Sequence, residues 1–331
     1  MNSRITIDDV AQALGVSKTT VSRAISGKGR VGKETKERIL QYIEQNNYKP
    51  SVMAQGLARS KTFNIGVIWP GDFEAVDLPF FQKCMVGMSE TVSMKGYDIL
   101  VSMIMGNDIS GLKRIVDNRK VDGVILTRTL VKDRPAEYLK KSGIPFVTIG
   151  TCDDPEIVQV DNDNFEACRE MTSILIGKGM RRLALLGGSS DHVITKTRLQ
   201  GFREGYLENG TNAEESLIYL DVDNDLKIAS VIGEVIRSGA DGLVCMDDAL
   251  AGKVIRKCKS EHIHIPKDLK LASFYNSTLL ENMSPGVTSV SFNERKLGSA
   301  VAGTLIDLIE GRKAESRKLK NYEVVLKEST K

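Results

Sequence analysis

Apolar strands that alternate with helices constrain most of this chain of 331 residues. The segment FNIGVIWP (63–70) predicts a buried strand, PFFQKCMVGMSETVSMKG (79–96) a helix and YDILVSMI (97–104) another strand. A further helix and two strands follow at 111–120, 121–127 and 143–150. Such alternation is typical of a parallel sheet wrapped by helices.

The same alternation restarts after residue 160. The expected segments are a helix at 164–179, a strand at 182–188, a helix at 197–210, a strand at 217–222, a helix at 228–239, a strand at 241–246, a helix at 250–260 and a strand at 269–275. The letters repeat as well, because ADGLVC from residue 240 echoes VDGVIL from residue 121. Two similar α/β lobes are therefore predicted. Their cleft should be lined by loops at the carboxyl ends of the strands, where open α/β sheets bind ligands.

The N-terminal segment carries the start and stop signals of two short helices. In TIDDVAQALGV, Thr6 caps a helix that Gly15 ends, and in SKTTVSRAISG, Ser17 caps a second helix. A turn of a few residues separates them, so the pair predicts a helix-turn-helix.

A third helix and a linker follow this pair. KETKERILQYIEQNNYKP (33–50) predicts a helix whose Ile39, Leu40 and Ile43 point inward. SVMAQGLARSK (51–61) is rich in small residues and predicts a linker that becomes a helix when something orders it.

The outer side of the second helix is polar and basic. Lys18, Thr19, Ser22 and Arg23 lie there and are not needed for packing. Lysine, arginine and short hydroxyls are side chains that bond base edges and phosphates in a major groove. Ordinary packing of two amphipathic helices is the alternative to DNA binding for this motif taken alone.

The distribution of charge favours DNA binding. Residues 1–61 carry eleven Lys and Arg against five Asp and Glu, a net charge of +6. The other 270 residues carry 35 against 38, a net charge of −3. Phosphate contacts require such a basic segment, whereas a solvated helical face would show mixed signs.

Composition favours a cytoplasmic protein without metal or cofactor. No uninterrupted apolar run approaches the ~20 residues of a membrane span, and the N-terminus lacks the apolar core of a signal peptide. The five cysteines are scattered without a C-x-x-C motif, which is typical of buried thiols in a reducing compartment. His262 and His264 form H-x-H on a predicted loop, and we expect no metal there because no carboxylate or cysteine pattern accompanies them.

An enzyme is the rival class of function. LLGGSSDH (185–192) is glycine-rich and follows a strand, but it lacks the G-K-[ST] of a phosphate-binding loop. No Ser-His-Asp or Cys-His set is indicated, because His192 alone among the histidines falls near the predicted cleft. An enzyme is therefore not predicted. An enzyme or a small-molecule-binding protein without DNA activity stays the alternative.

Motifs along essentially the whole chain resemble the LacI/GalR family of transcriptional regulators. They are TIDDVAQALGVSKTTVSRAIS, NYKPS and MAQGLARSK near the N-terminus, and VDGVIL, TRLQGF, PGVTSV and LGSAVAGTLIDLIEG in the body. The resemblance implies an all-α helix-turn-helix domain at 1–50, a hinge helix at 51–61 and a periplasmic-binding-protein-like α/β core of two Rossmann-like lobes at 62–331. The first lobe would span roughly 62–160, with 292–320 crossing back, and the second 161–291.

The resemblance further implies a homodimeric repressor. It would bind an inverted-repeat operator in double-stranded DNA, under the control of a small molecule, expected to be a carbohydrate, held between the lobes.

The resemblance gives roles to residues of the head and hinge. Lys18 and Thr19 match two residues that read operator bases. Leu57 matches a hinge leucine wedged into a minor-groove step, where unstacking bases costs a few kcal/mol that new contacts offset; packing within the linker is the alternative. The expected DNA-binding residues are Thr6, Ser17, Lys18, Thr19, Ser22, Arg23, Arg30, Ser51, Ala54 and Leu57.

It also gives roles to residues of the cleft. Arg198 matches an arginine that donates to effector hydroxyls or carboxylates, with a surface salt bridge as the alternative. Of the adjacent Phe80 and Phe81, one is expected to pack in the hydrophobic core of its lobe. Tyr275 and Gly150 stand where some members carry a carboxylate, which leaves the effector's identity open. The expected effector-binding residues are Phe80, Phe81, Gly150, His192, Arg198, Asp247, Tyr275 and Asn276.

Assembly is expected to stop at a dimer. Tetramers in this family can use a leucine-heptad helix after the core, whereas here NYEVVLKESTK predicts a last strand at Val324, Val325 and Leu326 with five residues after it. The methionine-rich helix face at 85–94 is a candidate for the dimer interface, and gap-filling inside one lobe is the alternative.

Overall fold

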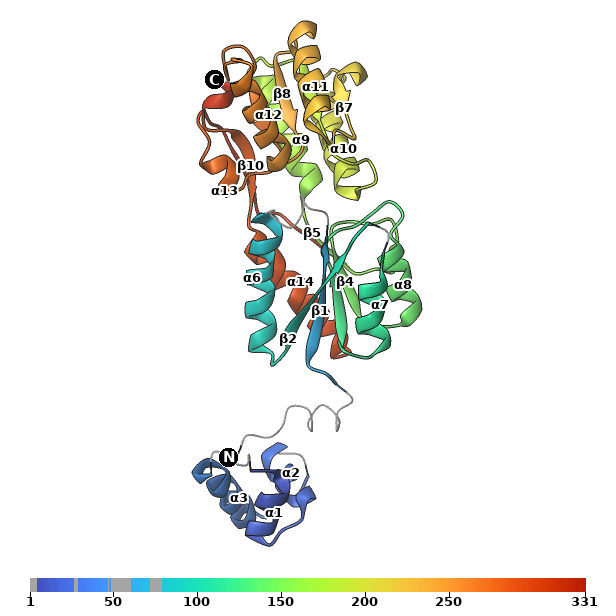
Figure 1. The fold of residues 1–331 in the computed structure, drawn as a ribbon, viewed down its shortest axis with the longest axis vertical. Coiled ribbons are helices and arrows are strands. Elements are labelled where there is room, and N and C mark those ends of the chain that lie inside the picture. The colour runs from blue at the N-terminus through green and yellow to red at the C-terminus, as the bar shows by residue number, and fades with distance from the viewer. Residues whose placement is uncertain (1–4, 27–28, 47, 49–60, 72–78, 107) are drawn as a thin grey trace. The chain divides into compact units, whose positions relative to one another are not determined.

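The computed structural model describes residues 5–26, 29–46, 48, 61–71, 79–106 and 108–331 (Figure 1). The chain divides into two compact units, Met1–Thr62 and Phe63–Lys331, which are called the head and the core below. No helix within the described ranges combines the length and apolarity needed to cross a membrane.

Among its described residues, the head contains three helices, α1 (Ile7–Leu14), α2 (Lys18–Ser26) and α3 (Lys33–Gln45). Thr6 caps α1 in a capping box with Asp9, and Gly15 ends the helix in the left-handed conformation at φ 65°. Ser17 Oγ accepts a hydrogen bond from the Thr20 backbone amide (3.1 Å) at the start of α2. The predicted helix-turn-helix and its caps are therefore confirmed.

One inward residue of the head was predicted wrongly. Ile39 is fully buried with Val10 and Val21, and Ile43 packs against the same cluster. Leu40 is 43% exposed instead. A step of one residue turns a helix by about 100°, so the residue after a core position moves off the buried face.

The core contains two six-stranded sheets. In the first sheet all pairings are parallel, and the strand order is β11-β5-β4-β3-β1-β2. Its strands are β1 (Asn64–Pro70), β2 (Asp98–Ile104), β3 (Gly123–Leu126), β4 (Phe146–Ile149), β5 (Gln159–Asn162) and β11 (Arg317–Leu319).

The second sheet has the order β12-β10-β9-β8-β6-β7. Its strands are β6 (Leu183–Leu186), β7 (Ile218–Tyr219), β8 (Gly242–Cys245), β9 (Leu271–Ser273), β10 (Thr288–Phe292) and β12 (Tyr322–Val325). β12 pairs antiparallel with β10, and the other neighbours are parallel. The predicted last strand therefore covers Val324 and Val325, while Leu326 follows it and is exposed.

Helices cover both faces of each sheet. The first lobe, built on the first sheet, carries α6 (Pro79–Met94), α7 (Ser110–Asp117), α8 (Arg134–Ser142) and α14 (Glu294–Ile309). The second lobe, built on the second sheet, carries α9 (Asn164–Gly177), α10 (Val193–Glu208), α11 (Asp225–Ser238), α12 (Asp248–Ser260) and the short α13 (Thr278–Glu281). α6 and α14 pack in one apolar cluster and α7 and α8 in another, and in the second lobe α9 and α10 share a cluster while α11, α12 and α13 share the other.

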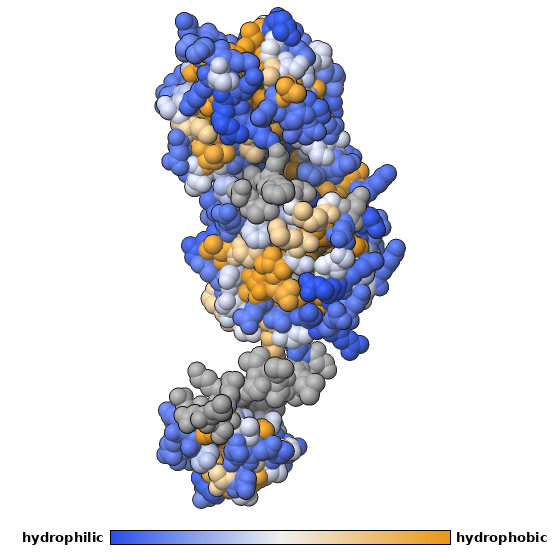
Figure 2. All heavy atoms as spheres, in the orientation of Figure 1, coloured by the Kyte–Doolittle hydropathy of each residue, from blue (hydrophilic) through white to orange (hydrophobic). Residues whose placement is uncertain are grey.

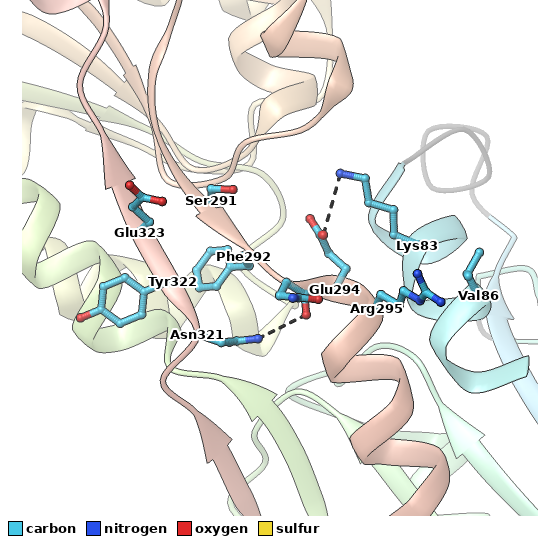
Figure 3. Close-up of a pocket in the computed structure, with 10 residues that line it drawn as sticks. Lys83, Val86, Ser291, Phe292, Glu294, Arg295, Asn321, Tyr322 and Glu323 are labelled. Atoms are coloured by element: carbon cyan, nitrogen blue, oxygen red, sulfur yellow. Dashed lines mark hydrogen bonds and ion pairs between the residues drawn. The ribbon is translucent and has the colours of Figure 1, made fainter. Parts of the chain in front are cut away.

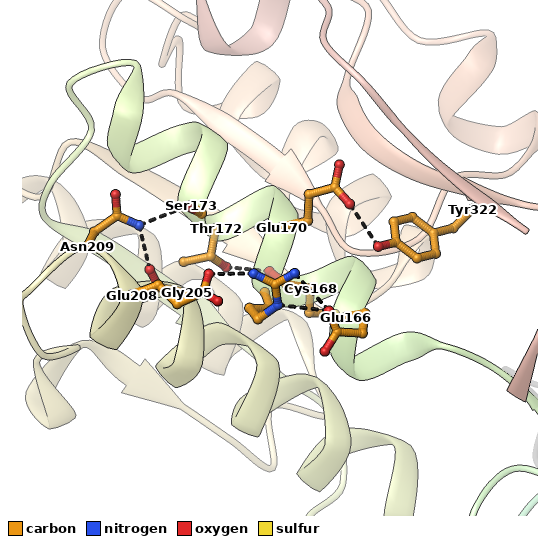
Figure 4. A network of polar contacts seen from close by, with 10 residues as sticks. Glu166, Cys168, Glu170, Thr172, Ser173, Gly205, Glu208, Asn209 and Tyr322 are labelled. Carbon is orange, nitrogen blue, oxygen red and sulfur yellow. Dashed lines mark hydrogen bonds and ion pairs between the residues drawn. The ribbon is translucent and has the colours of Figure 1, made fainter. Parts of the chain in front are cut away.

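The paired helices meet through glycine in both lobes. A Cβ on Gly298 of α14 would lie 2.0 Å from the Cys84 carbonyl oxygen of α6, and one on Gly205 of α10 would lie 2.6 Å from Thr172 Cβ of α9. Figure 4 shows the second contact, beside which Asn209 Nδ2 donates to Ser173 Oγ (2.8 Å). The duplicated lobes thus repeat a close helix contact as well as a strand order.

The chain passes between the lobes three times. The crossings run from β5 to α9 at 162–164, from β10 to α14 at 292–294 and from β11 to β12 at 319–322. Because the strands of both lobes end near these crossings, side chains that follow the strands face the region between the lobes.

Candidate functional site

The exposed face of α2 presents the residues expected to contact DNA. Lys18, Thr19, Ser22 and Arg23 are all exposed. Lys18 forms an ion pair with Asp8 of α1 (Nζ to Oδ1), which fixes the ammonium at the junction of the two helices. The position of a Cβ on Gly29 would be 3.1 Å from Arg23 Cδ, so the stem of Arg23 lies against the loop after α2.

Two other expected DNA-binding residues, Thr6 and Ser17, cap helices of the head. The Thr6 hydroxyl caps α1, and Ser17 Oγ lies 2.8 Å from Thr20 Oγ1 while it caps α2. A helix N-terminus with exposed amides and hydroxyls favours a phosphate, so a capping role is compatible with a backbone contact. Arg30 is exposed. Ser51, Ala54 and Leu57 lie outside the described residues.

A pair of loops joins the lobes across the cleft. Leu130, which follows β3, forms an antiparallel bridge with His192, which precedes α10. The Val131 amide donates to the Asp191 carbonyl (2.9 Å), and the Val193 amide donates to the Thr129 carbonyl (3.3 Å). We call residues 129–131 and 191–193 the strap. It holds the lobes together at a place separate in sequence from the three crossings.

Arg198 organises the inner wall of the cleft. Its Nη1 donates to the Met246 carbonyl (2.5 Å) after β8, and its Nη2 donates to Asn164 Oδ1 (3.4 Å) at the start of α9. Asn164 Nδ2 in turn donates to Asp161 Oδ1 (3.3 Å). Asp161 also accepts from the Asn162 amide (2.8 Å). Arg198 is therefore half-buried and takes part in this network rather than in a surface salt bridge.

Seven buried side-chain nitrogen or oxygen atoms have no hydrogen-bond partner among the described residues, and five of them lie on α10 or near the carboxyl ends of strands. These five belong to residues near the carboxyl ends of β1, β5, β8 and β9 and to α10, and are Trp69 Nε1, Asn162 Oδ1, Asp248 Oδ2, Asn276 Oδ1 and Arg198 Nε. A buried polar group left unpaired costs about 1–3 kcal/mol. Clustered vacant donors and acceptors are typical of a site that a polar ligand completes.

Burial perturbs two acids of the cleft. Burial raises the pKa of Asp161 to about 7, against the lowering effects of the Asn162 amide and of Arg198. Burial likewise raises the pKa of Asp248, against a hydrogen bond with Ser277 and the charge of Arg198. Buried acids whose charge is only partly compensated, at the mouth of a sheet, are features of functional sites.

Aromatic side chains form one side of the cleft. Phe81 is buried, with its ring centroid 6.1 Å from that of Trp69, so it belongs to the core of the first lobe. Phe80 is half-buried and packs against apolar clusters of both lobes, its ring centroid 5.9 Å from that of Tyr275 at 80°. Of the two phenylalanines, Phe80 is the one that reaches between the lobes.

Tyr275 is tied to Glu294, a residue that sequence reasoning missed. The Tyr275 hydroxyl donates to Glu294 Oε1 (2.6 Å), and Lys83 Nζ of α6 lies 3.8 Å from Glu294 Oε2. Burial, with the charge of Glu294, raises the pKa of Tyr275, so the phenol keeps its proton. The tyrosine is thus a donor held by a buried carboxylate that enters from the start of α14.

Three further residues were expected to bind the effector, namely Gly150, Asp247 and Asn276. Gly150 has φ 106°, and a Cβ there would lie 2.7 Å from Thr129 Oγ1, so a carboxylate could not occupy this position without moving the loop. The Asp247 side chain caps α12 by accepting from the Leu250 amide (2.8 Å). Asn276 is buried, and its Nδ2 donates to Glu281 Oε1 (3.2 Å).

A pocket lies beside this network, next to the crossings. It has a volume of about 620 Å³ and is lined by residues that include Lys83, Glu294, Asn293, Asn321 and Tyr322. Figure 3 shows Lys83 of α6 and Glu294 of α14 directed toward one another at its edge. Glu294 therefore borders both this pocket and the Tyr275 side of the cleft.

The histidine pair and the cysteines have ordinary surroundings. His264 Nδ1 lies 3.0 Å from Asp268 Oδ2, a carboxylate that sequence reasoning overlooked. Across the described ranges, no three His, Cys, Asp or Glu side chains gather as a metal site would require. Four of the five free cysteines are buried, and Cys152 is half-buried.

Known families match both units. The model of bacterial regulatory proteins of the lacI family matches residues 6–51, and the model of the periplasmic binding protein-like domain matches residues 172–330.

Whole proteins match over most of the chain. Catabolite control protein A of Staphylococcus aureus is 30% identical over 290 residues, which cover 86% of this chain and 87% of that protein. The HTH-type transcriptional regulator MalR of Streptococcus pneumoniae is 29% identical over 317 residues, or 93% of this chain and 94% of that one.

Solved structures of other regulators are similar to this chain in fold. A complex of the transcriptional regulator CelR with cellobiose is 26% identical, has a TM-score of 0.73 and covers 98% of this chain and 100% of its own. The lac repressor dimer bound to operator and an anti-inducer shares the fold, with a TM-score of 0.81, 20% identity and 99% coverage of both chains.

Proposed function

We propose that this chain, which belongs to the lacI family of bacterial regulatory proteins and is a DNA-binding transcriptional regulator, acts as a homodimeric repressor controlled by a carbohydrate. It would work in the cytoplasm on an inverted-repeat operator. The observation that carries the DNA-binding half is the exposed face of α2, with Lys18, Thr19, Ser22 and Arg23 beside a helix start. These side chains can contact base edges while the helix start contacts phosphate.

The carbohydrate effector is supported by the cleft and by a relative. The vacant donors and acceptors around Arg198 suit hydroxyl groups, which donate and accept at once. One related regulator was solved in complex with cellobiose. The cleft residues bind rather than catalyse in this proposal, and the relatives are transcriptional regulators.

The homodimer is supported by an apolar edge of the first lobe. Val101, Met103 and Met105 lie at alternate positions on the edge strand β2 and its end and are 46%, 43% and 56% exposed. Val86 and Met94 of the neighbouring helix α6 are exposed as well. Figure 2 shows apolar side chains gathered over this part of the first lobe. An exposed apolar patch on an edge strand is typical of a protein interface.

The helix face at 85–94 contributes partly to the hydrophobic core of the first lobe and partly to its exposed surface. Met88 and Val92 are buried in the first lobe, so part of its methionine content fills that core. Val86 and Met94 are exposed, and Val86 also lines the pocket beside Lys83 and Glu294. We therefore place the proposed dimer contact on β2 together with the outer side of α6.

Control of DNA binding would follow from linkage. A carbohydrate that binds one arrangement of the lobes better than another shifts the population toward that arrangement. Operator affinity changes by the same coupling free energy by which operator changes carbohydrate affinity.

Binding of duplex DNA to a paired set of variants tests the proposal. Lys18→Ala/Arg23→Ala should lose binding to a 30-base-pair duplex in low salt. Arg256→Ala/Lys259→Ala removes the same charge from α12 of the core and should retain it. Equal losses in the two double variants would contradict a DNA surface on α2.

A further inference from the structure

The strap, residues 129–131 and 191–193, connects the lobes in addition to the three crossings of the chain. We infer that the strap is a latch, which opens and closes while both lobes stay folded and whose state sets the affinity of the head for operator DNA. The effect on DNA rests on the proposed function, whereas the opening of the strap does not.

The strap joins the lobes through backbone groups alone. The Val131 amide donates to the Asp191 carbonyl (2.9 Å) and the Val193 amide to the Thr129 carbonyl (3.3 Å), on either side of one bridged pair of residues. A crossing is covalent and cannot part, whereas these hydrogen bonds can break and re-form. Two net hydrogen bonds favour the closed strap by about fivefold to 150-fold. The open strap is therefore a minor state that a modest change in free energy can populate.

Each half of the strap is shaped by its own lobe. In the first lobe, Asp133 accepts from the Leu130 amide through Oδ2 (3.1 Å) and from the Ala136 amide of α8 through Oδ1 (3.0 Å). In the second lobe, the Ser189 carbonyl accepts from the His192 amide (3.2 Å). None of these three bonds crosses between the lobes, so the two halves can separate without either loop losing its conformation.

The second-lobe half of the strap leads directly into α10. His192 is the N-cap of this helix and Val193 is its first residue. Further along the helix, Arg198 donates to the Met246 carbonyl (2.5 Å) and to Asn164 Oδ1 (3.4 Å), where the chain crosses from β5 to α9. Coupling between distant parts of a protein is carried by rigid elements that have two arrangements. A movement of α10 therefore reaches the strap and a crossing together.

The first-lobe half of the strap follows a strand that leads toward the head. Leu130 comes after β3, and β3 pairs in parallel with β1. β1 begins at Asn64, close to the boundary between head and core, and its other neighbour is β2, the edge proposed as the dimer contact. The strap is thus connected through two strand pairings to the elements that carry the head and join the protomers.

Proline at position 193 should open the strap without breaking α10. Proline lacks the amide that Val193 donates to the Thr129 carbonyl, and the first position of a helix needs no such donor. His192 is extended (φ −85°, ψ 128°), which is the conformation favoured before proline. Val193→Ala is the matched control, because it shortens the same side chain and keeps the amide.

Hydrogen exchange of the full-length protein, without DNA or ligand, tests whether the strap opens. The Val131 amide should exchange faster than the amides of the buried strand β8, and Val193→Pro should speed its exchange by about fivefold or more. Val193→Ala should leave the exchange rate unchanged. Exchange of Val131 only at the rate of the β8 amides would show that the strap is a fixed part of the fold and would overturn the latch.

A disulfide perturbs the strap in the opposite direction. Leu130→Cys/His192→Cys should close it when oxidised, because the Cα atoms of such a bridged pair lie about 4.5 Å apart. Oxidation should slow the exchange of Val131 by about fivefold or more, and reduction should restore it. This comparison uses one protein in two states, so it decides the matter even where Val193→Pro does not fold. Unchanged exchange on complete oxidation overturns the latch.

Fluorescence anisotropy on an inverted repeat selected from random DNA tests the effect on operator affinity. The operator Kd of the oxidised cysteine variant and that of Val193→Pro should differ by about twofold or more, and the unaltered protein should lie between them. Val193→Ala, and the unaltered protein treated with the same oxidant, should match the untreated protein. Equal Kd values for the open and closed forms overturn the role of the strap in DNA binding. An unaltered protein that binds no duplex DNA contradicts the proposed function instead, and hydrogen exchange still decides whether the strap is a latch.

Discussion

Replacing Asp161 with asparagine should stabilise the core, and more so at high pH. The carboxylate is fully buried, and its pKa rises from an ordinary value of 3.8 to about 7 in the folded state. Between these values the folded state holds a proton that the unfolded state releases. The free energy of unfolding therefore falls as pH rises from about 4 to about 7 and then levels.

The size of the effect follows from the two pKa values. Each pKa step is worth about 1.4 kcal/mol, so ionised Asp161 destabilises the folded state by about 4 kcal/mol above pH 7 and by less than half of that at pH 5. Asparagine keeps the acceptor that Asn162 and Asn164 use, at 2.8 and 3.3 Å. The stability of Asp161→Asn relative to the unaltered protein should therefore be about 3 kcal/mol greater at pH 8 than at pH 5.

Urea unfolding at the two pH values measures this difference. Trp69 is the single tryptophan of the chain and lies at the end of β1, so its fluorescence reports the core. Asp108→Asn is the control, because Asp108 is exposed and hydrogen bonds from Ser110 lower its pKa, which gives any pH effect the opposite sign. A stability difference for Asp161→Asn that is equal at pH 5 and pH 8 would refute the argument.

Four further outcomes are expected. Arg23→Ala should lose about 1–3 kcal/mol of operator binding and relax preference at one base pair; selection from randomised DNA measures this, and a uniform loss would indicate a phosphate contact alone. Leu57→Gly should reduce specific binding and DNA bending together, as circular-permutation gel shifts can show, and unchanged bending would remove the wedge. Cysteines at positions 130 and 192 should form a reducible disulfide, because non-hydrogen-bonded antiparallel pairs bring Cα atoms to about 4.5 Å; tryptic mapping detects it, and failure to oxidise would contradict the strap. Met103→Asp should turn dimers into monomers in sedimentation, and a mass near four chains for the unaltered protein would contradict assembly as a dimer.

Much of the fold could be predicted from periodicity. Strands such as β1 and β8 are continuous apolar runs between turn residues, and helices such as α11 and α12 have clear apolar faces. These patterns are local, so one sequence is enough to recognise them. The two similar lobes could be predicted because the alternation of strands and helices restarts after residue 160.

The elements that were missed have weak local patterns. β5 reads QVDN and β11 reads RKL, and neither shows an apolar run because polar residues follow the strands into the crossings. α8 buries only Pro135, Ala136 and Leu139 among charged residues. Their structure depends on neighbours in the sheet that are distant in the sequence.

Only part of the candidate site could be predicted, because its residues also come from segments that are distant in the sequence. Arg198 and Tyr275 lie in one network in the core, whereas Glu294 and Asp161 were not expected in it. Asp161 lies in β5, which has no apolar run, whereas Glu294 comes two residues after β10 and could have been singled out by asking which acidic residues come just after a strand. No local pattern could show that Glu294, from the start of α14, would meet Tyr275.

The central claim is that a ligand in the cleft changes the affinity of the head for a specific operator. Fluorescence anisotropy of full-length protein on an inverted repeat selected from random DNA, with and without a saturating neutral sugar, tests it directly. The account predicts that the sugar changes the operator Kd by about fivefold or more, and that operator changes the Kd of the sugar by the same factor. An operator Kd that is unchanged by a sugar bound in the cleft would contradict it.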